Sequence, residues 1–241
     1  MLLADERRLV AEYGRRMTRD GLVVETSGNL SIRNGELVAV TPSGHDYETL
    51  TAELVGVHRL DGSPVEAALA PTSEMPIHRL LYGHTGAGAV VHTHSTAATV
   101  VSTVLEELPT IHYVLAALGG PVRVAPYATF GSDQLAANVL AALEGRSGAL
   151  LANHGAVTYG PTMAVAYDRA RYLEWVCEVW LRAHSLGPGF TPRLLGEAEM
   201  AAVCTRSSGP SAHGVRWGGA GALRAGRGDG STDTMMRAWR S

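Results

Sequence analysis

The chain has 241 residues, of which 46% are hydrophobic and 18% are charged, and its formal net charge is −3. This composition is typical of a globular protein that can bury a sizeable core, and its charge gives no indication of a nucleic-acid partner. No apolar run approaches the ~18 residues that span a bilayer, and the first ten residues become charged too early for a secretory signal, so we expect no membrane association. Two cysteines without metal-ligand spacing are typical of a reducing compartment and predict a cytoplasmic protein.

The basic residues are unusual in kind, because all 20 are arginine. The absence of lysine excludes a lysine Schiff base, a P-loop lysine and a lysine general base. If this chain acts on a carbonyl compound, its electron sink must be a metal or a cofactor that needs no lysine.

The first third of the chain predicts two helices separated by two hairpins. Helical periodicity covers residues 5–21, with Asp5 as the candidate N-cap. An Asn-Gly turn at 34–35 and an Asp-Gly turn at 61–62 each lie between strand-like runs and predict hairpins. Residues 72–84 have the pattern of a capped helix.

The rest of the chain alternates strands with helices. The predicted strands lie at 88–94, 122–126 and 148–157. The predicted helices lie at 95–108, 132–145, 161–184 and 196–204. Because hairpins recur among interleaved helices, we expect an α/β protein with a mixed, mainly antiparallel sheet whose faces are covered by helices.

The character of the sequence changes beyond Arg206. The remaining segment is rich in Gly, Arg and Ser and has no sustained periodicity. Such a segment cannot bury enough apolar surface to offset the entropy lost on ordering. We therefore predict one domain over 1–205 and a disordered or loosely attached tail over 206–241.

Histidines supply the first candidate site. His92 and His94 stand two residues apart in a predicted strand, so their side chains share one face; packed, hydrogen-bonded imidazoles explain such a pair as well as a metal does. His154 adds a third candidate, because it ends an apolar run and precedes Gly155, where the backbone can turn sharply. Three histidines with one open position suit catalytic zinc, and Glu74 is the candidate fourth ligand. Ligand type alone leaves manganese, cobalt and iron(II) open.

Three short loops supply the second candidate site. Each is rich in hydroxyl groups and in Gly or Pro, and they lie at 26–29, 41–44 and 71–74. Converging N–H groups at a helix N-terminus bind anions without lysine, so these loops are the candidate phosphate site. Taken singly, each loop also has the composition of an ordinary turn.

Seven motifs occur in the order and spacing of the class II aldolase/adducin family: TSGNLSIR, TPSG, PTSEMPIHRLLY, VVHTHS, IHYVLAALGG, APYATFG and LLANHGAV. The chain resembles this family over residues 5–205, and most strongly its members that act on ketose 1-phosphates of the L-fuculose 1-phosphate type. The resemblance implies a three-layer α/β/α fold. It also implies a homotetramer with active sites between neighbouring subunits.

The resemblance implies roles for individual residues as well. His92, His94 and His154 match the zinc ligands of the family. Glu74 matches a carboxylate that ligates or adjoins the metal and then serves as acid and base. Tyr113 matches a tyrosine contributed across the subunit interface as a proton donor. The phosphate-binding positions of the family are matched by Gly28, Asn29, Ser43, Gly44, Thr72 and Ser73.

The implied reaction is zinc-dependent, reversible cleavage of a ketose 1-phosphate to dihydroxyacetone phosphate and an aldehyde. Alternatives within the family are L-ribulose-5-phosphate 4-epimerase, which has Asp where this chain has Glu74, and methylthioribulose-1-phosphate dehydratase. A non-catalytic, adducin-like interaction module is an alternative of another class, against which the intact histidine set argues. The relatives carry a closing tyrosine near the C-terminus, whereas here no tyrosine follows Tyr172.

Overall fold

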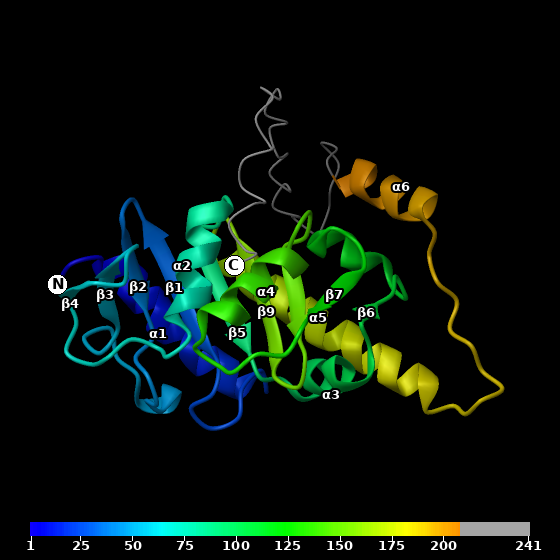
Figure 1. Cartoon of the computed structure of the whole chain (residues 1–241), viewed down its shortest axis with the longest axis horizontal. Coiled ribbons are helices and arrows are strands. Elements are labelled where there is room, and N and C mark those ends of the chain that lie inside the picture. Colours follow the sequence, from blue (N-terminus) through cyan, green and yellow to red (C-terminus); the bar gives the residue numbers. More distant parts are fainter. Residues whose placement is uncertain (208–241) are drawn as a thin grey trace, which may run out of the picture.

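The computed structural model describes residues 1–207 (Figure 1). The last described helix, α6 (Glu197–Ser207), runs two residues past the predicted domain boundary at 205. The rest of the predicted tail lies outside the described residues.

Nine strands of the described chain form one sheet in the order β4-β3-β2-β1-β5-β9-β8-β7-β6. Neighbouring strands are antiparallel except for the parallel pair β7–β8, so the predicted mixed, mainly antiparallel sheet is confirmed. The strands are β1 (Asn29–Asn34), β2 (Leu37–Val40), β3 (Gly56–Arg59), β4 (Pro64–Glu66), β5 (Ala89–Thr93), β6 (Glu107–Leu108), β7 (Val122–Ala125), β8 (Gly148–Leu151) and β9 (Gly155–Gly160).

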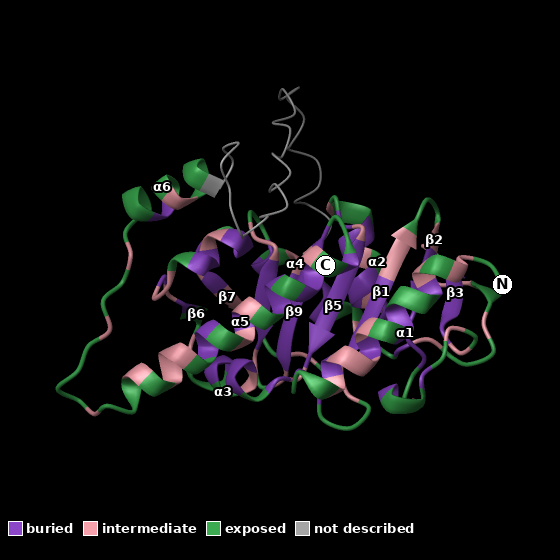
Figure 2. Ribbon diagram, turned by 180° about the vertical axis from the view of Figure 1, so that it is seen from behind, coloured by how far each residue is buried: buried purple, intermediate pink, exposed green. Residues whose placement is uncertain are grey.

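Helices cover both faces of this sheet, which confirms the three-layer α/β/α fold. The main helices are α1 (Ala4–Arg19), α2 (Met75–His84), α3 (Thr96–Val104), α4 (Asp133–Ala142) and α5 (Met163–His184). Helices α2 and α4 lie on the face toward the viewer in Figure 1, and α1, α3 and α5 lie on the face seen in Figure 2.

The alternation of side chains in β5 explains this layering. Val90 packs in the core beneath α2 and α4, whereas Val91 packs against α1 and α5. Both side chains are fully buried, as Figure 2 shows for most of the central strands. A strand buried on both faces needs an apolar run, which is the pattern that precedes the histidines in the sequence.

Both predicted hairpins are present. The Asn-Gly turn at 34–35 joins β1 to β2, and Gly35 has the positive φ of +61° that favours glycine in such a turn. The Asp-Gly turn at 61–62 joins β3 to β4.

The structure corrects two predicted helix boundaries. Helix α1 begins at Ala4, and Asp5 lies in its first turn, where its carboxylate favours the helix dipole, rather than at the N-cap. The helix predicted over 95–108 ends at Val104, and its last two residues form β6 beside β7. Leu108 precedes a proline, which disfavours helical backbone at that position.

The prediction of one strand over 148–157 was wrong, because this segment contains β8, a tight turn and the start of β9. Strand β8 ends at Leu151, β9 begins at Gly155, and the two run antiparallel. Asn153 has a φ of +56°, which asparagine tolerates better than most residues. His154 therefore lies in a tight turn at the edge of the core rather than within a strand.

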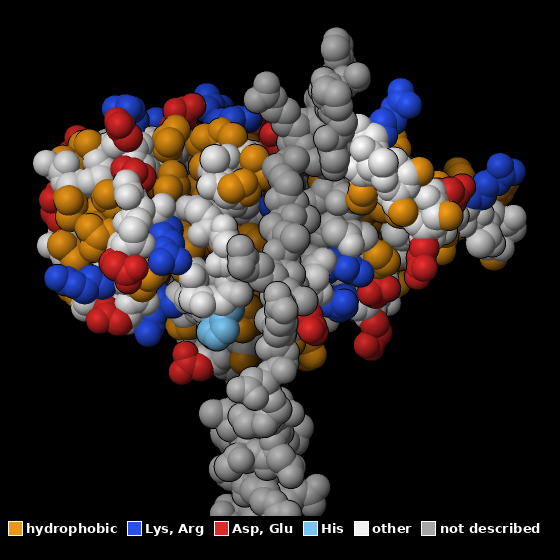
Figure 3. Space-filling view, turned by 90° about the horizontal axis from the view of Figure 1, so that it is seen from above, with side chains coloured by type: hydrophobic (Ala, Val, Ile, Leu, Met, Phe, Trp, Pro, Cys, Tyr) orange, Lys and Arg blue, Asp and Glu red, His pale blue; other side chains and the backbone are white. Residues whose placement is uncertain are grey.

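Two further features concern the charge on one face and the character of the helices. Over the visible part of the face in Figure 3, basic and acidic side chains are interspersed. Among the helices that the structure describes, none combines the length and apolar character needed to cross a membrane.

Candidate active site

Strand pairing and close backbone packing bring three segments to one point. Asn29 at the start of β1 stands opposite His92 in β5, and His94 follows one residue beyond the end of β5. The turn that carries His154 lies beside it, because a Cβ on Gly155 would be 2.1 Å from the carbonyl oxygen of Thr93. Glycine at this position permits that close approach.

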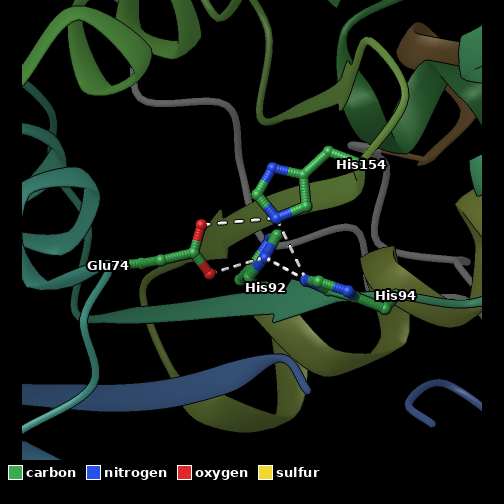
Figure 4. A group of neighbouring side chains, drawn as sticks. All are labelled: Glu74, His92, His94 and His154. Atoms are coloured by element: carbon green, nitrogen blue, oxygen red, sulfur yellow. Dashed lines mark hydrogen bonds and ion pairs between the residues drawn. The ribbon is translucent and has the colours of Figure 1, made fainter. Parts of the chain in front are cut away.

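Three imidazoles converge in this place (Figure 4). The Nε2 atom of His94 lies 2.9 Å from Nε2 of His92 and 3.1 Å from Nε2 of His154. The ring centroids are 4.7 to 4.9 Å apart, with the rings nearly perpendicular to one another. The three nitrogens therefore face a common centre.

Glu74 closes the group from the opposite side (Figure 4). It immediately precedes α2, and its Oε2 atom lies 2.9 Å from Nε2 of His92 and accepts a hydrogen bond from Asn29 at 3.0 Å. Its Oε1 atom is buried, lies 3.4 Å from Nε2 of His154 and has no hydrogen-bond partner among the described residues.

The electrostatics keep Glu74 ionised and most of the imidazoles neutral. Burial by itself raises the pKa of Glu74, but the charges and hydrogen bonds of His92, His154 and Asn29 outweigh burial and lower the pKa far below its usual range. Burial, together with the neighbouring histidines, lowers the pKa of His94 to about 3 and that of His154 to about 4. Burial opposes a charge on His92 as well, yet the Glu74 carboxylate raises the pKa of His92.

These residues fit a divalent cation. The four candidate ligand atoms lie within 4.8 Å of one another. A tetrahedral zinc ion with Zn–N bonds of about 2.1 Å separates its nitrogens by roughly 3.4 Å, close to the spacing here. His92 also donates from Nδ1 to the carbonyl of Ala156 at 2.9 Å, which directs the Nε2 lone pair toward the centre. A cation would satisfy both this lone pair and the orphaned Oε1 atom of Glu74.

The three polar loops predicted to bind phosphate meet beside this cluster. The backbone N–H of Thr72 donates to the carbonyl of Thr41 and joins two of the loops, and the N–H of Ser43 donates to the carbonyl of Ala70, just before the third loop; each bond is 3.0 Å long. The pocket between them is lined by Thr26, Ser27, Gly28, Asn29, Pro42, Ser43, Gly44, Thr72, Ser73, Glu74, His94, Phe130 and His154. The structure thus brings all six predicted phosphate-binding residues into one pocket with three of the candidate metal ligands, Glu74, His94 and His154. Their phosphate role stays a prediction.

Tyr113 and Phe130 differ in their relation to the pocket. Tyr113 begins the short 3-10 helix η2 (Tyr113–Leu118), is 49% exposed and is not among the residues that line the pocket. Phe130 lines the pocket although the sequence pattern predicted no role for it. Its place in the APYATFG motif was the available signal. Gly131 fits tightly against the neighbouring loop, since a Cβ there would lie 2.8 Å from the carbonyl oxygen of Ser73.

Comparison with known proteins decides the family. Residues 8–181 match the family described as Class II Aldolase and Adducin N-terminal domain. The chain belongs to this family. This class II aldolase is 37% identical over 212 residues to 5-deoxy-D-ribulose 1-phosphate aldolase of Bacillus thuringiensis serovar kurstaki, covering 87% of this chain and 98% of that protein.

Two further aldolases are similar to this chain. It is 37% identical over 167 residues to L-fuculose phosphate aldolase of Escherichia coli strain K12, covering 68% of this chain and 77% of that protein. A solved structure of L-fuculose 1-phosphate aldolase superposes with a TM-score of 0.81 at 33% identity, covering 86% of this chain and 97% of that one. The predicted family is confirmed, and the chain is a metal-dependent aldolase of the lyase class.

Proposed function

We propose that this class II aldolase uses Zn²⁺ to cleave a ketose 1-phosphate reversibly into dihydroxyacetone phosphate and an aldehyde. The observation that carries the proposal is that the cluster of three histidines and Glu74 opens into the pocket formed by the three polar loops. One substrate can therefore reach a metal with its carbonyl end and an anion-binding cradle with its phosphate.

The proposed phosphate cradle suits a protein without lysine. Its members supply hydroxyl groups, an amide side chain and backbone N–H groups, and Thr72 and Ser73 directly precede the N-terminus of α2. Such groups bind phosphate through hydrogen bonds and the helix dipole. Binding the non-reacting end of the substrate in this way orients the carbonyl at the chemical centre.

The residues that would hold the metal are His92, His94, His154 and Glu74. The absence of thiolate from this donor set favours catalytic over structural zinc, although Mn²⁺, Co²⁺ or Fe²⁺ have the same ligand preferences. A bound zinc ion would supply a Lewis acid that withdraws electrons from the ketose carbonyl. Such an acid stabilises the charge of the transition state by several kcal/mol.

Protons move through two side chains in the proposed reaction. In the direction of synthesis, the Glu74 carboxylate accepts a proton from the carbon beside the carbonyl of dihydroxyacetone phosphate. The resulting nucleophilic carbon attacks the aldehyde, and Tyr113 of the partner subunit donates its O–H proton to the aldehyde oxygen. Cleavage runs through the same transfers in reverse. The exposure of Tyr113, outside the pocket of its own chain, supports a homotetramer in which it serves a neighbouring site.

The identity of the ketose separates two candidates. The relatives are named for L-fuculose phosphate and for 5-deoxy-D-ribulose 1-phosphate, and both sugars carry a methyl group at the end remote from phosphate. Phe130 is 67% exposed and lines the pocket, where it offers an apolar surface to such a methyl group. We propose the L-fuculose 1-phosphate type first and the 5-deoxyribulose 1-phosphate type as the second candidate.

A substrate panel tests the proposal. The zinc-loaded enzyme is given L-fuculose 1-phosphate and 5-deoxyribulose 1-phosphate, and dihydroxyacetone phosphate is measured by a coupled assay. Epimerase activity on L-ribulose 5-phosphate and dehydratase activity on methylthioribulose 1-phosphate are measured in parallel. Release of dihydroxyacetone phosphate from either ketose 1-phosphate supports the proposal. Turnover confined to the epimerase or dehydratase substrate contradicts it.

We propose that residues 1–205 form the catalytic domain, that the enzyme is a homotetramer, and that it acts in the cytoplasm, in keeping with its low cysteine content. Truncation after Cys204 should leave zinc binding intact, and loss of zinc from that variant would contradict the proposed domain boundary.

A further inference from the structure

A row of buried polar side chains leads from the core to Glu74. Asn29 contacts Glu74 and His78, with its Oδ1 atom 2.5 Å from Nε2 of His78. The other ring nitrogen of His78 lies 2.6 Å from the hydroxyl of Ser31, which lies 2.7 Å from the hydroxyl of Tyr82. Each of these residues is no more than 5% exposed. Strand β1 and helix α2 supply them in alternation.

The direction of every hydrogen bond in this row follows from the ionised carboxylate. Because Glu74 can only accept, Asn29 must present its amide N–H to Glu74 and its carbonyl oxygen to His78. Nε2 of His78 must then carry a proton, and in the neutral ring this leaves Nδ1 as an acceptor. The Ser31 hydroxyl therefore donates to Nδ1, and the Tyr82 hydroxyl donates to Ser31. All four donors point toward Glu74.

We propose that His78, Ser31 and Tyr82 are positioning residues that orient the Asn29 amide and, through it, the Glu74 carboxylate. An amide flipped by 180° would place the Asn29 oxygen against the carboxylate and its N–H₂ group against the Nε2–H of His78. The row forbids that flip. It holds Oε2 of Glu74 by the Asn29 hydrogen bond, while Oε1 faces His154. The two carboxylate oxygens therefore have different partners. This inference rests on the proposed function of Glu74 in the aldol reaction.

The chemistry of the row suits a fixed support. Burial and the nearby His92 lower the pKa of His78 to about 3, although Glu74 opposes this shift. Burial raises the pKa of Tyr82, although its hydrogen bond with Ser31 opposes the rise. Neither group changes its charge near neutral pH, and aligned hydrogen bonds in a buried site polarise one another.

The first test observes the His78 ring directly. ¹⁵N-histidine spectra of the full-length, zinc-loaded protein, assigned by comparison with His78→Gln, should show His78 neutral and protonated at Nε2 from about pH 5 to 8. A ring protonated at Nδ1, or one that titrates in this range, would overturn the deduced direction of the row.

The second test compares His78→Leu with His78→Gln. Leucine leaves the Asn29 oxygen unpaired, whereas glutamine can place an N–H group near the position of Nε2. His78→Leu should lower kcat and zinc affinity by about 10- to 100-fold, the usual effect of removing support from a metal ligand, and His78→Gln should recover most of both. Equal losses in the two variants, or wild-type values in His78→Leu, would overturn the proposal.

A third test separates positioning from a loss of packing. If the row positions Glu74, the drop in kcat should diminish with distance from Glu74, from His78→Leu to Ser31→Ala to Tyr82→Phe. If the variants only lose packing, the drop in kcat should instead follow their melting temperatures. Tyr167→Phe is the matched control, because it removes a hydroxyl from another buried tyrosine that donates instead to Asp20. Losses of kcat that follow melting temperature, with Tyr167→Phe included, would contradict a positioning role.

Failure of the proposed function would be recognised separately. If wild-type enzyme cleaves no ketose phosphate, the aldol assignment fails, while the tautomer of His78 and the zinc affinities of the two His78 variants still decide the positioning role.

Discussion

Asn29 and His92 stand directly opposite each other in the antiparallel pair β1–β5. This single cross-strand pair joins the first loop of the candidate phosphate pocket to the first candidate metal ligand. Their side chains meet at the Glu74 carboxylate, since Asn29 donates to Oε2 and His92 lies 2.9 Å from the same atom. The register of two central strands thus places the anion cradle beside the metal centre.

Removal of the Glu74 charge should lower kcat far more than it lowers the zinc content. In Glu74→Gln, three histidines still hold zinc, but the side chain can no longer accept the substrate proton. We expect kcat to fall about 10²- to 10⁴-fold while much of the zinc is retained, as measured by metal analysis and steady-state kinetics. Glu36→Gln, at an 84% exposed carboxylate, is the control. Full activity of Glu74→Gln would remove this residue from the mechanism.

Zinc affinity should fall at low pH because one proton competes with the metal. His92 has a raised pKa because of Glu74, so below that pKa a proton competes with the metal, and affinity should fall about tenfold per pH unit. Above it, affinity should be constant. His94 and His154, with pKa values of about 3 and about 4, add no further protons above pH 5. Chelator competition between about pH 5 and 8 measures the slope. A slope of two or more protons would contradict this ordering.

Gly28 lies so close to strand β5 that the methyl group of an alanine there should disturb the contact. Gly28 has a φ of +72°, and a Cβ there would lie 2.8 Å from the carbonyl oxygen of His92. Gly35 has a similar φ of +61°, but a Cβ there would meet no atom within 4 Å. Alanine at either position costs about 1–2 kcal/mol for left-handed backbone.

Gly28→Ala should therefore lower stability more than Gly35→Ala and should also lower zinc affinity. Urea unfolding and zinc titration of the two variants measure these effects. Equal stabilities, or unchanged zinc affinity in Gly28→Ala, would show that the loop can move away from His92 without consequence.

The N-terminus of α3 depends on a carboxylate from another helix. Glu174 in α5 accepts hydrogen bonds from the backbone N–H groups of Ala97 and Ala98 at 2.9 and 2.8 Å. The N-cap residue Ser95 makes no side-chain capping bond, so Glu174 takes that role. Glu174→Ala should cost about 0.5–2 kcal/mol of unfolding free energy, the range for a lost cap.

Glu178→Ala, one turn further along α5, is the matched control for Glu174→Ala. Its carboxylate pairs with Arg182 on the same helix and is 48% exposed, so its loss should cost no more than about 0.5 kcal/mol. Urea unfolding compares the two variants. Equal losses would contradict a capping role for Glu174.

Local sequence patterns were sufficient to predict much of the fold. The Asn-Gly and Asp-Gly turns predicted their hairpins because the preference for positive φ is a property of two residues. The helix predicted over 132–145 is present as α4, and Ser132 caps it by accepting a hydrogen bond from the N–H of Leu135. The predictions failed where a neighbour in space decided the outcome. Residues 107–108 leave the helical pattern to pair with β7, and 148–157 turn back on themselves to pair β8 with β9.

The sequence by itself determined the kinds of group available to the site: a lysine-free chain with three histidines, a carboxylate and polar loops. It also indicated the family through ordered motifs. Only the tertiary structure decided that His154 reaches the other imidazoles from a turn, that Tyr113 lies outside the pocket of its own chain, and that His78 supports Asn29. The physical reason is that residue preferences act over a few neighbouring positions, whereas these contacts span up to 60 residues and depend on strand register and on packing across the sheet.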